Sequence, residues 1–384
     1  MKLWIALFLP LALVACVSTP PVPKTTQFFN DHLFSQSAEP INVDDVFSTN
    51  PEMEEYLRSH IAPQLKLKGY QKGLFDALYN KQQLKLEYDS VMTKNAAQTF
   101  TSKTGNCLSL AIMTAAFAKK IGLSIEFQSV IIEETWSRSG DLYINAGHVN
   151  IVLGRRYLSS RTGYLGDQQL TIDFLPPEEI RGQRTHVLNE GTILAMYLNN
   201  RAAELLLQGK LDDAYWAARE AIKQDANFIP PYNTLGVIYK RHGNFSEAQQ
   251  VLSFALQYAP DNTVVMSNLA QIFKDLGRVD EATMLASRLQ KIQPYPPFYF
   301  FHLGQAAMQR EDYAAAKSSF AKEVARDPNY HEFHFWLALA HSRLGEYKQA
   351  SEQLSIAHEN STTQHDHDLY AAKLNKLKSL QMQQ

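Results

Sequence analysis

The sequence contains very little cysteine, because Cys16 and Cys107 are the two cysteines in 384 residues. Two cysteines can form at most one disulfide, so a fold held together by several disulfides is excluded. The sequence also lacks an excess of charge of either sign: 37 Lys and Arg residues and 39 Asp and Glu residues give a formal net charge of −2. A general nucleic-acid binder carries a strongly basic surface, so we expect no nucleic-acid partner. With 45% apolar residues, the chain is long enough for two hydrophobic cores.

The N-terminus has an apolar run, but a short one. Lys2 precedes apolar residues 3–15, and this run ends at Cys16. About 20 apolar residues are needed to cross a bilayer, so the pattern indicates a secretory signal peptide over residues 1–15. Residues 13–16, Leu-Val-Ala-Cys, resemble the lipobox of bacterial lipoproteins. The resemblance implies cleavage before Cys16 and lipidation of that cysteine, and a plain signal peptide cleaved nearby is the alternative.

The residues after Cys16 are expected to form a tether. Prolines at positions 20, 21 and 23 make this segment semi-rigid, and we assign residues 16–40 to the lipidated cysteine and its tether. In Gram-negative lipoproteins an Asp directly after the lipidated cysteine is associated with retention in the inner membrane, and Val17 stands there. The resemblance thus implies a protein held at the membrane of the cell envelope by its lipid, in the outer membrane and facing the periplasm if the host is Gram-negative.

Residues 41–190 show helical patterns followed by strand patterns. Asn50 and Pro51 are placed as the N-cap and first residue of a helix. An apolar helix is predicted from Cys107 to Lys120, ended by Gly122. Strand-like runs follow at residues 125–132, 148–153 and 170–174. We therefore expect an α+β domain over residues 41–190.

From residue 193 the sequence repeats with a period of 34 residues. An alanine lies five residues after each member of a series of turn residues, namely Gly209, Gly243, Gly277, Glu311 and Gly345. The pattern resembles the tetratricopeptide repeat, with five units over residues 193–361 and a capping helix and tail over residues 362–384. The resemblance implies an all-α solenoid of helix hairpins, whose stacked units share a continuous core and a concave groove.

The groove is expected to bind a protein or peptide. Helical register places cations, amides and aromatic residues on the face that usually lines it: Asn233, Lys240, Arg241, Ser267, Gln271, Lys274, Phe301, Gln305, Phe335 and Arg343. This mixture suits an extended peptide with some acidic character. A role in packing alone is the alternative.

Cys107 lies at the first turn of the predicted apolar helix. The unpaired N–H groups and the positive end of the helix dipole stabilise a thiolate there and can donate to an oxyanion. A papain-type site also needs a histidine and an orienting carboxylate. His148 and Asp173 follow in strand-like runs, 41 and then 25 residues later. The alternative is a buried, inert cysteine.

This ordered set resembles the transglutaminase-like superfamily over about residues 90–180. The matching residues are Gly105, Cys107, Ala111 and Gly122 for its cysteine helix, Gly147 and His148 for its histidine strand, and Ile172, Asp173 and Phe174 for its aspartate strand. The resemblance implies that Cys107 is the nucleophile, His148 the general base and acid, and Asp173 the orienting carboxylate. Gln98, nine residues before Cys107, is the candidate side-chain donor to the oxyanion. No metal or other cofactor is expected.

The function implied is thiol-dependent acyl transfer at protein or peptide amide bonds, by a peptidase or amidase whose repeats recruit the substrate. Two alternatives remain open. An amine acceptor would make the protein a cross-linker, and a site without activity would leave a non-catalytic, repeat-containing lipoprotein scaffold of the envelope.

The lipobox resemblance predicts that Cys16→Ser abolishes acylation and leaves unprocessed precursor. Metabolic labelling with an alkynyl fatty acid measures this, with Cys107→Ser as the matched control that keeps its label. Equal labelling of Cys16→Ser and the parent chain would end the lipoprotein hypothesis.

Overall fold

The structure is a computed structural model that describes most of the chain. The described residues are 25–38, 41–79, 84, 86–89, 92–131, 136–139, 142–145, 147–156, 169–174, 182–361 and 363–381. The predicted signal peptide and Cys16 lie outside them. Within these ranges, the structure contains no helix with the length and apolar character needed to cross a membrane.

The α/β domain begins with a series of helices, of which the last is buried. They are α1 Pro51–Tyr56, continued by a π-helical turn at Leu57–Ile61, then α2 Ala62–Lys68, α3 Tyr70–Tyr79, α4 Ala96–Ser102 and α5 Cys107–Lys120. The Asn50 side chain caps α1 by accepting from the Met53 N–H at 2.8 Å, as the sequence predicts. Every residue of α5 from Cys107 to Ala118 is buried, which suits a helix that is apolar all round.

A four-stranded antiparallel sheet packs against α5. Its strands, in the order β7-β6-β3-β8, are β7 Leu170–Ile172, β6 His148–Arg156, β3 Leu123–Ile131 and β8 Arg184–Leu188. Two small pairs accompany it: β1 Glu87–Tyr88 with β2 Thr104–Gly105, and β4 Trp136–Ser139 with β5 Leu142–Asn145. Val149, Ile151 and Leu153 of β6 lie in the core that contains α5, as their alternation predicts. His148, Asn150 and Val152, on the other face of β6, are buried as well.

Five helix hairpins follow, as the period of 34 predicts. The first helices are α7 Glu190–Leu207, α9 Pro230–His242, α11 Thr263–Asp275, α13 Tyr299–Gln309 and α15 His331–Arg343. The second helices are α8 Leu211–Gln224, α10 Phe245–Tyr258, α12 Val279–Ile292, α14 Tyr313–Arg326 and α16 Tyr347–Glu359, and α17 Gln364–Gln381 caps the end. Each recurring turn residue has a positive φ, including Glu311 at 61°. This conformation explains why glycine stands at the other four positions.

Helix α7 joins the two domains. Ile193 near its start lies in the core of the α/β domain. Ala202, Leu205 and Leu206 near its end lie in the core of the first repeats. The predicted boundary at residues 190–193 therefore falls at the beginning of a helix that belongs to both cores.

Residues 25–38 are packed against the repeats, although the sequence assigns them to a tether. They include two 3-10 turns, Thr25–Phe28 and Asp31–Leu33. The Phe34 ring stacks on Tyr215 of α8 with ring centroids 3.9 Å apart, and the Tyr239 hydroxyl of α9 donates to the Phe28 carbonyl at 2.7 Å. The prediction of a tether is wrong for these residues, because their aromatic side chains complete the core of the first repeats.

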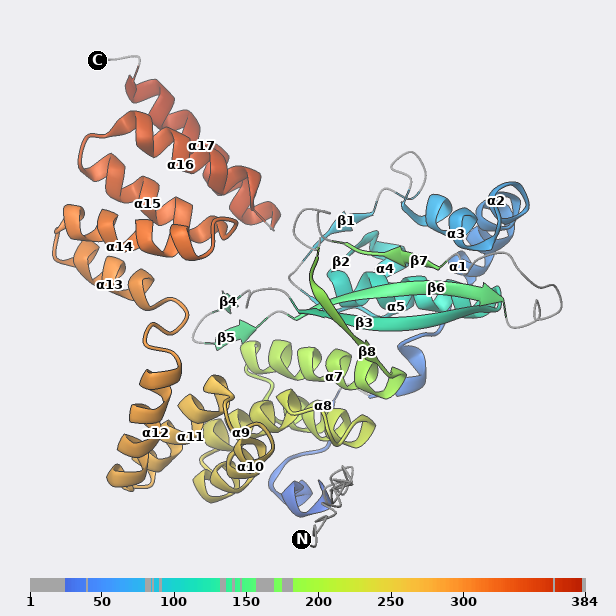
Figure 1. Cartoon of the computed structure of the whole chain (residues 1–384), viewed down its shortest axis with the longest axis horizontal. Coiled ribbons are helices and arrows are strands. Elements are labelled where there is room, and N and C mark those ends of the chain that lie inside the picture. Colours follow the sequence, from blue (N-terminus) through green and yellow to red (C-terminus); the bar gives the residue numbers. More distant parts are fainter. Residues whose placement is uncertain are drawn as a thin grey trace, which may run out of the picture.

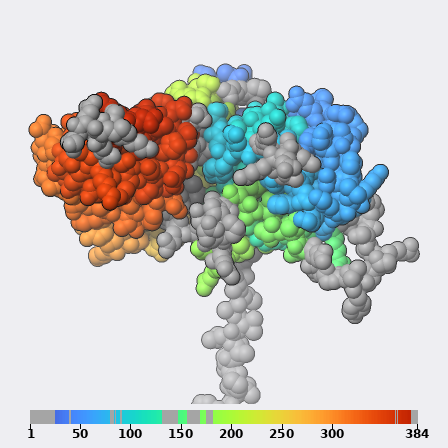
Figure 2. All heavy atoms as spheres, turned by 90° about the horizontal axis from the view of Figure 1, so that it is seen from above, coloured from blue at the N-terminus to red at the C-terminus, as the bar shows by residue number. Residues whose placement is uncertain are grey.

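The array of repeats is interrupted, which the sequence does not predict. Within residues 182–361, all of which are described, successive helices pack closely except α12 and α13. Residues 293–298 connect them, and the cores on either side are separate. Figure 1 shows α13–α17 turned away from α7–α12, and Figure 2 shows the C-terminal helices, in orange and red, as a lobe of their own. The predicted continuous core is therefore wrong at this point.

The docked segment generates a prediction about local stability. Phe34→Ala removes a buried ring and should cost about 3 kcal/mol, equivalent to about a hundredfold in the docking equilibrium. We expect amide hydrogen exchange in residues 25–38 to accelerate by about that factor. His32→Ala, at an exposed position of the same segment, should leave the exchange unchanged. Equal exchange in both variants would contradict the packing described.

Candidate functional site

Cys107 is the first residue of α5, and the preceding residue caps that helix. The Asn106 side-chain oxygen accepts from the Ser109 N–H at 2.9 Å and from the Ser109 hydroxyl at 2.8 Å. The cysteine side chain is buried, and its Sγ lies 4.0 Å from the Gly147 carbonyl oxygen, directly before β6. The helix start therefore presents the thiol to the strand that carries the predicted histidine.

The structure brings His148 and Asp173 together. His148 Nε2 and Asp173 Oδ1 are 2.6 Å apart, and both side chains are buried. Since Nε2 is engaged with the carboxylate, Nδ1 is the remaining ring nitrogen, and Cys107 lies close enough to raise the pKa of the imidazole. The three predicted residues thus form one chain of contacts, in the order Cys107, His148, Asp173.

Asn150 is a fourth member of this group that sequence analysis did not assign. Ile151 pairs with Ile172 in the antiparallel register of β6 and β7, so continuing by one residue places Asp173 opposite Asn150. Asn150 Nδ2 donates to Asp173 Oδ2 at 3.0 Å, which leaves Oδ1 of the same carboxylate for His148. Asn150 is itself buried, and each oxygen of the Asp173 carboxylate has its own partner.

The electrostatics of His148 are dominated by its partners. Burial lowers the pKa of the imidazole, but hydrogen bonds to Asp173 and Cys107 and the charges of both outweigh burial and raise the pKa to about 9. A buried imidazolium is stabilised here because a carboxylate lies within hydrogen-bond distance of it. Such a ring can hold a proton beside the sulfur and release it later.

Thr93 connects this site to the first repeat. Its hydroxyl accepts from Asn106 Nδ2 at 3.0 Å and from Asn200 Nδ2 of α7 at 3.2 Å. Its N–H donates to Glu204 Oε1, also of α7, at 2.6 Å. The residue that caps the cysteine helix is therefore joined to the repeats through one threonine.

Gln98 has a different role from the one predicted. It forms a capping box at the start of α4, where its Oε1 accepts from the Asn95 N–H at 3.1 Å and its N–H donates to Asn95 Oδ1 at 2.9 Å. The side chain is exposed there. This engagement argues against the oxyanion role that the resemblance implies for Gln98.

The predicted groove residues are divided by the break between α12 and α13. In the first part, successive first helices lie side by side, since Asn199 bonds Thr234 at 2.7 Å and Asn233 bonds Asn268 at 2.8 Å. Arg241 donates to the Leu206 carbonyl at 3.0 Å, and Lys240 lies 3.8 Å from Asp275. The exposed members there are Arg241, Ser267, Gln271 and Lys274.

In the second part, the aromatic groove residues are mostly covered. Phe301 is fully buried, because Phe333 and Trp336 of the next hairpin pack on it, so its placement in the groove is wrong. Phe335 is half-buried against Tyr370 of α17. Gln305 is half-buried, and Arg343 is exposed.

Comparison with protein families identifies the hairpins. A tetratricopeptide repeat model matches residues 239–296, and a second matches residues 301–360. The hairpins within these two ranges are tetratricopeptide repeats. Neither match includes Cys107, His148 or Asp173, and the break in the array adjoins the gap between the two matches. A comparison with curated proteins found no match.

Several solved structures are similar to the chain. YrrB, described as a TPR protein with an unusual peptide-binding site, is 20% identical, covers 47% of this chain and 92% of its own, and has a TM-score of 0.26. MamA AMB-1 is 22% identical, with coverages of 44% and 91% and a TM-score of 0.25. A Pseudomonas aeruginosa protein, pilF, is 19% identical, with coverages of 48% and 84% and a TM-score of 0.30.

The contact between His148 and Asp173 predicts a pH dependence. The His148 pKa of about 9 should fall toward 6.5 in Asp173→Asn, because an amide has no charge to hold the proton. Histidine NMR titration measures this, with His148→Gln identifying the signal.

Because the folded pKa lies above the ordinary value, the protonated ring stabilises the fold below about pH 6.5, and this stabilisation is lost as pH rises through about 9. Asp173→Asn should lose less stability across that window, and an identical midpoint in both proteins would contradict the contact.

Proposed function

We propose that the chain is a protein-binding repeat protein of the cell envelope. The observation that carries this proposal is the run of tetratricopeptide repeats, because stacked helix hairpins offer an extended surface for a peptide. Arg241, Gln271 and Lys274 are exposed on the first helices of the first part of the array. A partner with an acidic, extended segment suits these side chains.

Charge reversal tests this binding surface. Lys274→Glu combined with Gln271→Ala should weaken binding of a fluorescein-labelled peptide of alternating Glu and Ala residues by about tenfold, equivalent to about 1.4 kcal/mol. Fluorescence anisotropy measures the affinity. Lys223→Glu on α8, another exposed lysine outside the proposed surface, should bind like the parent. Equal affinities of all three proteins, or no binding by the parent, would refute the proposed surface.

A second candidate function is thiol-dependent acyl transfer in the α/β domain, as in the transglutaminase-like superfamily. Its support is the convergence of Cys107, His148 and Asp173, which lie far apart in the sequence and meet in the order that such chemistry requires. The proposal places the catalytic work in this domain and leaves substrate recruitment to the repeats.

The geometry suggests how each residue would act. His148, whose raised pKa keeps the ring protonated at neutral pH, would hold the proton given up by Cys107, and the Sγ thiolate would attack the carbonyl carbon of an amide. The carbonyl oxygen would accept a hydrogen bond from the Cys107 N–H. The imidazolium would then protonate the leaving amine as the thioester forms. Water would attack the thioester with His148 as base, releasing the acid and the free thiol, whereas an amine would produce a cross-link. Asp173, held by Asn150, would keep the ring oriented throughout.

A small acyl donor tests the second candidate independently of any natural substrate. Incubation with p-nitrophenyl acetate should give one acetyl group on Cys107, detected by intact-protein mass spectrometry, and none in Cys107→Ala. His148→Ala should acetylate at least a hundredfold more slowly, and His32→Ala, an exposed histidine, should match the parent. A parent protein that is not acetylated, or whose rate ignores His148→Ala, would leave the scaffold function alone.

The envelope location belongs to the same proposal. It rests on the resemblance of residues 13–16 to a lipobox, and these residues lie outside the described ranges. Lipidation of Cys16 would hold both the repeats and the α/β domain at a membrane surface.

A further inference from the structure

The first helix after the break exposes a face that its counterparts bury. Leu303 of α13 is 46% exposed, whereas its equivalents 34 residues apart, Leu235, Leu269 and Leu337, are at most 5% exposed. Tyr299 is 39% exposed, and its equivalents Pro231, Val265 and Phe333 are all buried. In the other hairpins this face is covered when the first helix packs on the second helix of the preceding hairpin.

The second helix before the break is uncovered as well. Ala286 of α12 is exposed, although the residues at its position in the other four second helices, Ala218, Leu252, Phe320 and Leu354, are buried. Leu289 is half-buried, and its equivalents Ala221, Ala255, Glu323 and Ala357 are buried. The two sides of the break are therefore the two halves of one repeat-to-repeat interface that is not formed within this chain.

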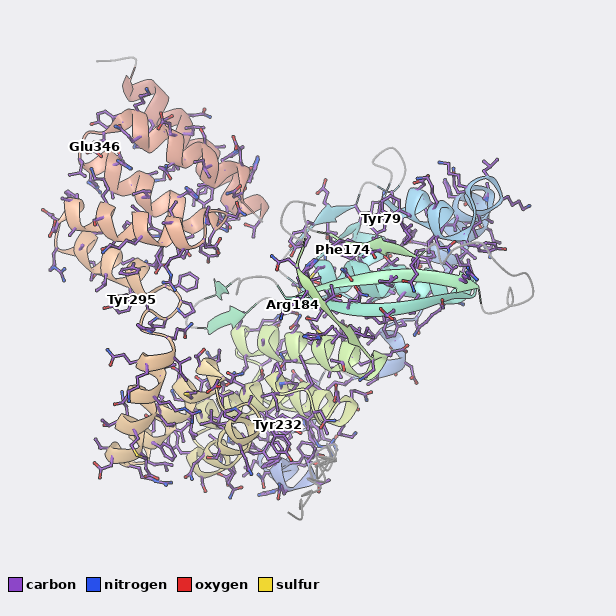
Figure 3. All side chains as sticks on the ribbon, in the orientation of Figure 1. Tyr79, Phe174, Arg184, Tyr232, Tyr295 and Glu346 are labelled. Carbon is purple, nitrogen blue, oxygen red and sulfur yellow. The ribbon has the colours of Figure 1, made fainter. Side chains whose placement is uncertain are left out.

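The segment between the halves is fastened to one of them. Arg326 of α14 donates to the Tyr295 carbonyl at 2.9 Å and to the Pro296 carbonyl at 3.3 Å. The Tyr295 ring, labelled in Figure 3, has its centroid 5.0 Å from that of the Phe300 ring. Phe298 is buried in the core of the second part. These contacts hold residues 295–298 to the second part of the array, so the segment belongs with α13 and not with α12.

We propose that two copies of this chain exchange their C-terminal repeats, so that α13 of each packs on α12 of the other. The second copy fits each exposed face because the same contact of a first helix on the preceding second helix recurs at α8 with α9, α10 with α11 and α14 with α15. The exchange is reciprocal, so it closes into a dimer with twofold symmetry. The exchange buries Leu303 and Tyr299 of both copies. Removing these exposed apolar side chains from water favours the dimer.

The intact interfaces identify a residue pair that reports the contact. Asn199 bonds Thr234, and Asn233 bonds Asn268, across successive first helices. The equivalent pair at the break, 34 residues further along, is Ser267 and His302, and both side chains are exposed. In the exchanged dimer, Ser267 of one copy faces His302 of the other.

Disulfide formation between singly substituted chains tests the exchange. The full chain is purified in detergent with Cys16→Ser and Cys107→Ser, and Ser267→Cys protein is mixed with His302→Cys protein. We expect a disulfide-linked pair containing one chain of each kind. Asn233→Cys with Asn268→Cys in one chain is the matched control, which should form its disulfide within the chain.

Two other outcomes would overturn the proposal. A disulfide formed within the Ser267→Cys, His302→Cys double variant, but not between single variants, would mean that the array closes within one chain. No disulfide in either case, while the control forms its own, would mean that the faces do not meet.

A variant without cysteine substitutions gives a second measurement. Leu303→Asp should shift the light-scattering mass of the full chain from that of two copies to that of one at the same concentration. Because Leu303 is half exposed in the single chain, its helical content by circular dichroism should match the parent. A parent with the mass of one copy at every concentration would refute the dimer.

Discussion

Asn106 uses both ends of its side-chain amide, and the arrangement of the candidate site depends on this. Its oxygen caps α5 and fixes where Cys107 begins the helix, while its nitrogen reaches Thr93. Thr93 in turn contacts Asn200 and Glu204 of the first repeat helix. A helix cap contributes about 1 kcal/mol to stability, but here its larger consequence is geometric: the position of the thiol and the seating of the repeats are set by the same few hydrogen bonds.

The sequence predicted which three residues come together at the candidate site, but it did not predict their supporting contacts. Cys107, His148 and Asp173 are chemically distinctive and stand at a helix start and in strand-like runs. Asn150 has no such signal, because its role follows from the register of two strands that are far apart in the sequence. Gln98 shows the converse. Its distance from Cys107 along the chain suggested a role, but it also lies three residues after Asn95, and the capping box formed by that spacing is what the structure contains.

Local periodicity predicted the helices well and long-range packing poorly. The 34-residue period and the positive-φ turns fix each hairpin, and the apolar character of α5 predicts its burial. Strand β8, Arg184–Leu188, was missed because its side chains are mostly exposed and show no alternation. The break after α12 was missed for a different reason. Leu303 has the residue type that the repeat pattern places in a buried interface, so the sequence gives no sign that α13 does not pack on α12 of the same chain.

The docking of residues 25–38 also constrains the order in which the chain folds. Asn30 and Tyr239 are hydrogen-bonded although 209 residues separate them. A ribosome makes the N-terminal segment first, and its partners on α8 and α9 appear only after most of the α/β domain has been synthesised. Phe28 and Phe34 must therefore remain without their native partners during that interval. The first repeats consequently finish folding late, as expected where contacts span a long loop, and the newly made segment is a place where a chaperone or a protease would meet an unprotected chain.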